Sequence, residues 1–112
     1  MKIYHNPRCR KSRETLQILQ DAGKEVEIIE YLKTPPTASE LKTIIAQLGI
    51  KPEKLIRNGE AIFKENYKGK TFTDEEWIDI MVKNPILIER PIVIKDGKAV
   101  LGRPPENVKG LL

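Results

Sequence analysis

The chain has 112 residues, of which 39% are hydrophobic and 32% charged, a composition typical of one soluble globular domain. No apolar run approaches the ~20 residues that a membrane-spanning helix needs. Because Cys9 is the only cysteine and His5 the only histidine, an intrachain disulfide and the usual Cys/His metal sites are excluded. The N-terminus has no apolar signal core, so we expect a cytoplasmic protein whose thiol stays reduced.

The charge balance favours an anionic ligand only weakly. Twenty Lys and Arg against 16 Asp and Glu give a net charge of +4, which suits an anionic small molecule, a nucleic acid or no partner in particular. Aromatic residues make up only 5% of the chain and offer little surface for stacking bases. We therefore expect no nucleic-acid partner.

The first thirty residues predict a strand, a helix and a second strand. Lys2–His5 is a short strand candidate that Asn6-Pro7 ends, and residues 10–22 carry apolar side chains at helical spacing. Residues 26–31 form the second strand candidate, so the segment predicts a β-α-β unit with a right-handed crossover. Cys9 falls where the loop meets the helix.

The middle of the chain, about 37–84, is predicted to be helical. Thr37–Glu40 and Thr73–Glu76 each form a capping-box pattern ahead of apolar residues at helical spacing. A further helical region is expected over 52–63.

The C-terminal part predicts a β-hairpin followed by a short helix. Residues 92–95 and 98–101 flank Asp96-Gly97, the signal of a two-residue type I′ turn, and the helix is expected after Pro104-Pro105. The whole chain therefore predicts a single α/β domain. Its four-stranded mixed sheet is flanked by helices and interrupted by the helical insertion of 37–84.

Cys9 is the candidate nucleophile. The N-terminus of a helix stabilises a thiolate through its free N–H groups and its dipole, and the Ser12 hydroxyl can donate a hydrogen bond to the sulfur. Nearby cations are expected to lower the pKa of the thiol and to attract anions: Arg8, Arg10, Lys11 and Arg13. The alternative is a small buried cysteine without chemical function, which so many neighbouring cations disfavour.

Two familiar classes of cysteine enzyme do not fit the residues after Cys9. The tyrosine-phosphatase signature needs an arginine six residues after the cysteine, where this chain has Thr15. A Cys-x-x-Cys oxidoreductase is excluded because Ser12 stands at the second position, so any redox cycle must borrow its second thiol. His5 is either a packed residue at a strand end or a group that influences Cys9.

Three arginines fall at the boundaries of predicted elements: Arg57, Arg90 and Arg103. Surface arginines usually have no special function, but Arg90 and Arg103 precede prolines that flank the hairpin, where an Arg-Pro bond can be cis in a tight turn. The planar guanidinium suits a tetrahedral oxyanion. We expect such an anion to sit at the helix N-terminus beside Cys9.

Five segments resemble the glutaredoxin-coupled arsenate reductases, a family with a thioredoxin-like fold: YHNPRCRKSRETL, YLKTPP, KLIRNGE, FTDEEWIDIMVKNPILIERPIVI and LGRPPE. These segments cover nearly the whole chain in order. The resemblance implies a set of site residues: Cys9 as the catalytic cysteine, His5 as a group that helps to set its ionisation, Arg57, Arg90 and Arg103 as oxyanion ligands, and Pro91 as the cis-proline of the fold.

The resemblance also implies a reaction, the reduction of arsenate to arsenite in arsenic detoxification. The Cys9 thiolate attacks arsenate, glutathione joins the adduct as a co-substrate, and glutaredoxin supplies the reducing step. No cofactor stays bound and a monomer is expected. Two alternatives remain open: a glutathione-dependent thiol oxidoreductase with another substrate, and a non-catalytic redox regulator of the same fold that binds RNA polymerase.

Overall fold

The structure, a computed structural model, describes all 112 residues, which form two compact units. The first unit combines Met1–Thr34 with Arg90–Leu112, and the second is the continuous segment Pro35–Glu89. The second unit contains the helical segment expected over 37–84 and extends a little beyond it at both ends. No helix in either unit is long and apolar enough to cross a membrane.

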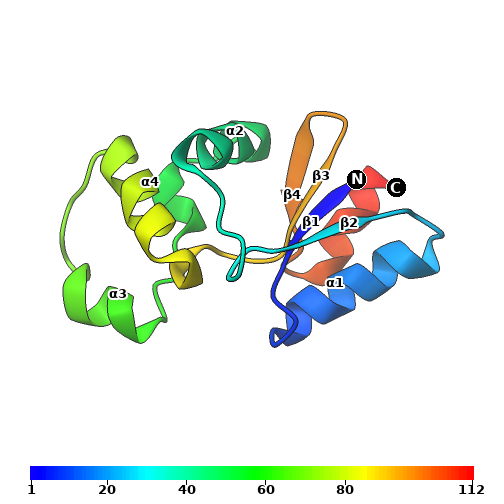
Figure 1. Cartoon of the computed structure of the whole chain (residues 1–112), viewed down its shortest axis with the longest axis horizontal. Coiled ribbons are helices and arrows are strands. Elements are labelled where there is room, and N and C mark those ends of the chain that lie inside the picture. The colour runs from blue at the N-terminus through cyan, green and yellow to red at the C-terminus, as the bar shows by residue number, and fades with distance from the viewer. The chain divides into compact units, whose positions relative to one another are not determined.

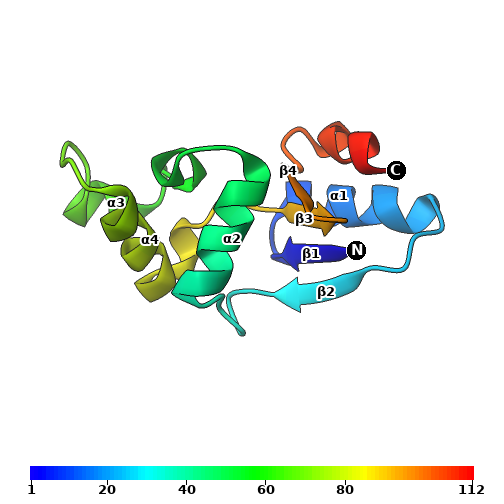
Figure 2. The ribbon, with the colours of Figure 1, turned by 90° about the horizontal axis from the view of Figure 1, so that it is seen from above.

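All four strands belong to the first unit and form one sheet in the order β2-β1-β3-β4 (Figure 1 and Figure 2). β1 (Lys2–His5) pairs parallel with β2 (Glu27–Glu30) and antiparallel with β3 (Ile92–Lys95). β3 in turn pairs antiparallel with β4 (Lys98–Leu101). The predicted four-stranded mixed sheet is confirmed, and its two central strands come from opposite ends of the chain.

The turn between β3 and β4 confirms the predicted hairpin. Asp96 has φ 50° and Gly97 has φ 78°, and a type I′ turn requires positive φ at both central residues. Lys95 and Lys98 are paired across this turn. The turn at Asp96 and Gly97 therefore decides which residues of β3 and β4 pair with each other.

Helix α1 (Arg10–Asp21) and the terminal 3₁₀ helix η3 (Pro105–Leu111) pack against each other, and together with the sheet they enclose the core of the first unit. Five side chains from β1, α1, β3 and η3 form this core, each at most 8% exposed: Ile3, Leu19, Val93, Val108 and Leu111. Burial of such side chains contributes about 1.5–3 kcal/mol each. Because the core fixes α1 against the sheet, it also fixes the place of the residue that precedes the helix, Cys9.

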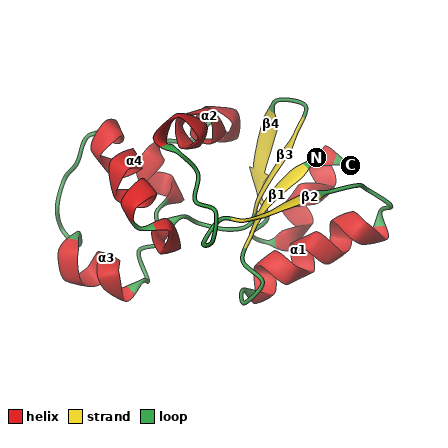
Figure 3. Ribbon diagram, viewed as in Figure 1, coloured by secondary structure: helices red, strands yellow, loops and turns green.

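The second unit consists of helices (Figure 3). These are α2 (Ala38–Leu48), α3 (Ala61–Asn66) and α4 (Asp74–Lys83), together with the 3₁₀ helices η1 (Pro52–Leu55) and η2 (Pro85–Leu87). α2 packs against α4. Both predicted capping boxes are confirmed: the Oγ1 atoms of Thr37 and Thr73 accept the N–H groups of Glu40 and Glu76, at 3.1 and 3.2 Å.

The prediction of one helical region over 52–63 is wrong. The chain forms η1, leaves it at Ile56 to make an isolated β-bridge with Ile88, turns, and then begins α3. The backbone N–H of Arg57 donates to the carbonyl of Leu87 at 2.8 Å. The backbone groups of Ile56 and Arg57, which a continuous helix would use for its own hydrogen bonds, thus bond to a segment about thirty residues later in the chain.

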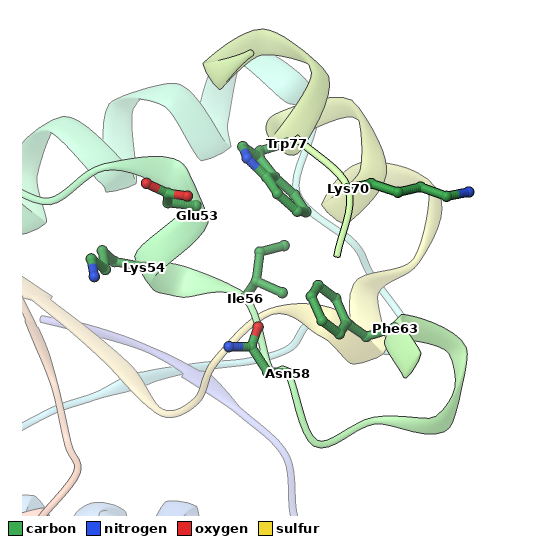
Figure 4. Close-up of a pocket in the computed structure, with 7 residues that line it drawn as sticks. All are labelled: Glu53, Lys54, Ile56, Asn58, Phe63, Lys70 and Trp77. Atoms are coloured by element: carbon green, nitrogen blue, oxygen red, sulfur yellow. The ribbon is translucent and has the colours of Figure 1, made fainter. Parts of the chain in front are cut away.

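An aromatic cluster lies between α3 and α4. The rings of Phe63 and Trp77 are stacked with centroids 6.3 Å apart, and Phe72 meets Trp77 edge-on at 4.8 Å. A cavity of about 350 Å³ opens beside this cluster, where Figure 4 shows Ile56, Phe63 and Trp77 along its wall. None of the site residues predicted from the sequence lines this cavity.

Candidate active site

Cys9 is the N-cap residue of α1, as predicted. Its backbone is extended, with φ −92° and ψ 122°, and its carbonyl accepts the N–H of Arg13 at 3.0 Å, which is the first hydrogen bond of the helix. The N–H of Cys9 donates to the carbonyl of Asn6 at 3.0 Å. The partly exposed sulfur therefore lies at the end of α1 where free N–H groups point out of the helix.

Asn6 fixes the loop that carries Cys9, and sequence reasoning missed it. Besides its bond to Cys9, it donates its own N–H to Oγ of Ser12 at 3.1 Å and accepts the N–H of Arg8 on Oδ1 at 3.0 Å. Its side chain is buried. The signal was present in the sequence, because an Asn directly after a strand and before a Pro often closes a turn with its own side chain.

Ser12 contacts the site differently from the prediction. Its hydroxyl, predicted to donate to the thiolate, lies 2.6 Å from Nδ1 of His5 and accepts the N–H of Asn6. The group of Ser12 that hydrogen-bonds the Cys9 sulfur is its backbone N–H. The fully buried hydroxyl therefore braces the loop, and the helix backbone acts on the sulfur.

The pKa of the Cys9 thiol lies below its ordinary value. Burial alone would raise this pKa, but hydrogen bonds from the backbone N–H groups of Ser12 and Lys11 and the guanidinium of Arg90 lower it by more. Free N–H groups at a helix N-terminus and a nearby cation both favour the thiolate. The sulfur is thus prepared as a nucleophile.

The cations beside Cys9 in the sequence are not the ones that lower its pKa, in contrast to the prediction, and two of them bind other groups. Arg10 pairs with Glu14 at 2.8 Å, and Arg13 donates to the carbonyl of Pro7 at 3.0 Å. The cation that lowers the pKa of Cys9 is Arg90, from the other end of the chain. Proximity in sequence was a poor guide because α1 turns its charged side chains outward.

Arg90 and Arg103 converge on the sulfur within the first unit. Nη1 of Arg103 lies 3.8 Å from Sγ of Cys9 and also donates to the carbonyl of Arg90 at 3.3 Å. Arg90 is only 8% exposed, and its side chain forms a hydrogen bond with the thiol. Each arginine precedes a cis peptide bond, to Pro91 as predicted and to Pro104.

Gly102 lets the end of β4 approach α1 closely. A Cβ atom at this position would lie 2.6 Å from Oγ1 of Thr15 and 2.8 Å from Cγ of Pro91. Thr15 is fully buried, and its hydroxyl lies 3.2 Å from the carbonyl of Gly102. Since Arg103 is the next residue, this contact places its backbone beside the helix that begins at Cys9.

His5 is buried at the end of β1 and touches the site through Ser12. Burial lowers the pKa of its imidazole, the carboxylate of Glu30 raises it in part, and Arg13 lowers it further. The net effect is that the pKa of the His5 imidazole lies below its ordinary value, which favours the neutral form. His5 is connected to Cys9 through Ser12, which contacts His5 with its hydroxyl and the Cys9 sulfur with its backbone N–H in the first turn of α1.

Arg57 lies in the second unit, where two carboxylates bind it. Its Nη1 is 2.6 Å from Oε1 of Glu89 and its Nε is 3.2 Å from Oε1 of Glu60. Although burial lowers the pKa of this guanidinium, the two carboxylates raise it above its ordinary value. Its function as a third oxyanion ligand stays a prediction from the resemblance.

The first unit thus presents a stabilised thiolate, two guanidinium groups and the free N–H groups of a helix end. This combination suits nucleophilic attack on a tetrahedral oxyanion, because the cations and N–H groups stabilise the negative charge of the anion and of the transition state. No three His, Cys, Asp or Glu side chains gather in a way that could hold a metal ion.

Comparison with known proteins assigns the chain to a family. The profile of the ArsC family matches residues 4–111. The uncharacterized protein YfgD of Escherichia coli K12 is 48% identical over 110 residues, which cover 96% of this chain and 92% of that protein. An arsenate reductase of Escherichia coli K12 is 44% identical over 98% of this chain and 79% of that protein. The solved structure of an arsenate reductase from Vibrio cholerae is similar with a TM-score of 0.95 at 43% identity, covering 100% of this chain and 98% of that one, and it confirms the thioredoxin-like fold. The chain therefore belongs to the ArsC family.

Proposed function

We propose that this protein is an arsenate reductase whose nucleophile is Cys9. The observation that carries the proposal is the convergence of Arg103 and Arg90 on a thiol with a lowered pKa at the start of a helix. The relatives named arsenate reductase, at 40–44% identity over almost the whole chain, support the same substrate.

The first step forms a bond between sulfur and arsenic. The Cys9 thiolate attacks the arsenic atom, an As–O bond breaks, and the leaving oxygen departs as water after taking up protons. Arsenic remains As(V). Arg90 and Arg103 stabilise the negative charge on the remaining oxygens, which rises during attack.

The electrons come from two external thiols. Glutathione displaces a second oxygen from arsenic as water, and a glutaredoxin thiolate then attacks the glutathione sulfur. The electron pair of that S–As bond stays on arsenic, which becomes As(III), and a glutaredoxin–glutathione disulfide leaves. Hydrolysis of the Cys9–As bond releases arsenite. In sum, arsenate and two thiols give arsenite, one disulfide and water. A chain with one cysteine needs such outside thiols.

The proposal also covers the co-substrate, the partner protein, the oligomeric state and the cellular compartment. Glutathione is a co-substrate rather than a bound cofactor, and the protein works as a monomer that meets glutaredoxin in a reducing cytoplasm. A lone thiol keeps its nucleophilic form only under reducing conditions.

A coupled assay tests the proposal. Purified protein with glutathione, glutaredoxin and glutathione reductase should consume NADPH only when arsenate is added, and Cys9→Ser should abolish this consumption. Arsenate should also slow the alkylation of Cys9 by iodoacetamide. Full activity in Cys9→Ser, or no arsenate-dependent turnover in the intact protein, would overturn the proposal.

A further inference from the structure

The proposed function requires a second thiol to reach arsenic on Cys9, and the inference below rests on it. A hollow of about 230 Å³ lies in the first unit beside the loop that carries Cys9. Four of its lining residues are the four that lead into Cys9, His5–Arg8, and three come from the end of β2 and the turn after it: Glu30, Leu32 and Lys33. The hollow and the sulfur therefore share one loop.

The loop is rigid where it borders the hollow. Asn6 holds the N–H groups of Arg8 and Cys9 at 3.0 Å each. His5, in the wall of the hollow, is 2.6 Å from Ser12, whose backbone N–H acts on the Cys9 sulfur. A ligand seated here is thus held at a fixed place relative to the nucleophile.

Arg8 gives the hollow an available cation. The exposed Arg8 guanidinium takes part in no ion pair or hydrogen bond, whereas Arg10 is paired with Glu14 and Arg13 is bonded to Pro7. Lys33 adds a second positive charge, paired with Glu30 at the longer distance of 3.5 Å. A guanidinium without a partner is well suited to bind a carboxylate through two parallel hydrogen bonds.

The size and walls of the hollow restrict its ligand. Its volume is below the roughly 300–1,000 Å³ of pockets that enclose a whole drug-sized molecule, so it fits one end of a small molecule. Its walls are mainly apolar, and Leu32 is 40% exposed beside it. Such walls suit the methylene and backbone carbon atoms that precede a terminal carboxylate.

We infer that this hollow binds one carboxylate-bearing end of the peptide thiol that joins the arsenic adduct on Cys9, with the Arg8 guanidinium as the ligand of the carboxylate. Glutathione carries a carboxylate at each end, and both ends share this chemistry. Binding one end beside Cys9 holds the thiol near the sulfur–arsenic bond and raises its effective concentration there.

Arg8→Gln and Arg10→Gln form a matched pair of variants. Each removes one exposed arginine charge adjacent to Cys9, but only Arg8 lines the hollow. In the coupled assay Arg8→Gln should raise the KM for glutathione roughly tenfold, the size expected for a lost charge-assisted hydrogen bond, and leave the KM for arsenate unchanged. Arg10→Gln should leave both constants unchanged. An equal rise in both variants, or no rise in Arg8→Gln, would overturn the inference.

Other thiols show which group is recognised. With 2-mercaptoethanol, which has no carboxylate, the two variants should reduce arsenate at the same rate, and a specific defect of Arg8→Gln with this thiol would contradict carboxylate binding. With glutathione esterified on its glycine, Arg8→Gln should no longer raise the KM for the thiol if the glycine carboxylate is the one that binds in the hollow. If Arg8→Gln still raises the KM for the esterified thiol, the carboxylate in the hollow is that of the γ-glutamyl end.

A second measurement does not depend on arsenate. Cys9 should form a mixed disulfide with oxidised glutathione, which releases one glutathione thiolate, and mass spectrometry follows its rate. Arg8→Gln should slow this exchange several-fold relative to Arg10→Gln. If the intact protein reduces no arsenate and Arg8→Gln still slows the exchange, the proposed function fails and the thiol site stands. Equal exchange rates in the two variants would overturn the site itself.

Discussion

Nη1 of Arg103 lies 3.8 Å from the sulfur of Cys9, although 94 residues separate the two in the chain. The same nitrogen donates to the carbonyl of Arg90, so one guanidinium links the nucleophile to the turn before β3. A guanidinium is planar and presents its N–H donors in a fixed fork, a geometry that suits an oxyanion. The site is therefore held together by the group proposed to bind its substrate.

Arg90→Met should raise the pH at which Cys9 becomes reactive. Methionine keeps much of the buried volume but removes the charge and the hydrogen bond that lower the pKa of the thiol. The alkylation rate with iodoacetamide should fall several-fold at pH 7, and its dependence on pH should move upward. Arg13→Met is the control, because Arg13 bonds the carbonyl of Pro7, and an unchanged profile in Arg90→Met would contradict the assignment.

Ser12→Ala should separate loop stability from thiol reactivity. The substitution leaves the buried N–H of Asn6 and Nδ1 of His5 without their 3.1 and 2.6 Å partner, which should lower the free energy of unfolding by about 1–3 kcal/mol. The pH profile of Cys9 alkylation should change little, because the backbone N–H of residue 12 remains. Denaturant titration and alkylation measure the two quantities. A large upward shift of the alkylation profile would show that the hydroxyl itself acts on the sulfur.

His5 should make the protein less stable in mild acid. Its pKa is lowered in the folded state, so below about pH 6.5 the unfolded chain binds a proton that the folded chain does not. Stability should fall as the pH drops from 6.5 through the lowered pKa, by at most about 1.4 kcal/mol per pH unit from this group. Denaturation at several pH values should show this loss in the native protein and a smaller one in His5→Gln. Equal slopes would mean that His5 titrates normally.

Arg57→Ala should destabilise the protein whether or not Arg57 binds the oxyanion. Glu60 and Glu89 lose the cation that lies 3.2 and 2.6 Å away, which should cost about 1–3 kcal/mol in the free energy of unfolding. Adding Glu60→Gln and Glu89→Gln should restore much of the stability. If Arg57 is also an oxyanion ligand, the triple variant should keep a raised KM for arsenate. A KM equal to that of the native protein would assign Arg57 a purely structural function.

Local chemistry made much of the fold predictable. The Asp96-Gly97 turn and the two capping boxes depend on residues within four positions of each other, and all three were predicted correctly. The error over 52–63 has the opposite cause. Ile56 pairs with Ile88, and no short-range pattern reveals such a partner.

The candidate site was likewise predictable from the sequence only where it depends on neighbouring residues. Cys9 at a helix N-cap follows from the Asn6-Pro7 break and the helical spacing after it, so it was predictable from the residues alone. The cation that lowers its pKa was not, because Arg90 reaches the sulfur only through the pairing of β1 with β3. The Arg-Pro positions that flank the hairpin and the resemblance to a known family pointed to Arg90 and Arg103 as oxyanion ligands, and neither pointed to an effect of Arg90 on the thiol.

The pairing of β1 with β3 has a consequence for the synthesis of the chain. Residues 35–89 form a compact unit and are complete before β3 leaves the ribosome, whereas β1 must wait for its central neighbour. Cys9 is made before Arg90, which lowers the pKa of its thiol, and before Arg103, which follows 94 residues later in the chain. The cysteine of the nascent polypeptide therefore lacks the cation that lowers its pKa, and it gains its full reactivity only once β3 has been made and paired with β1.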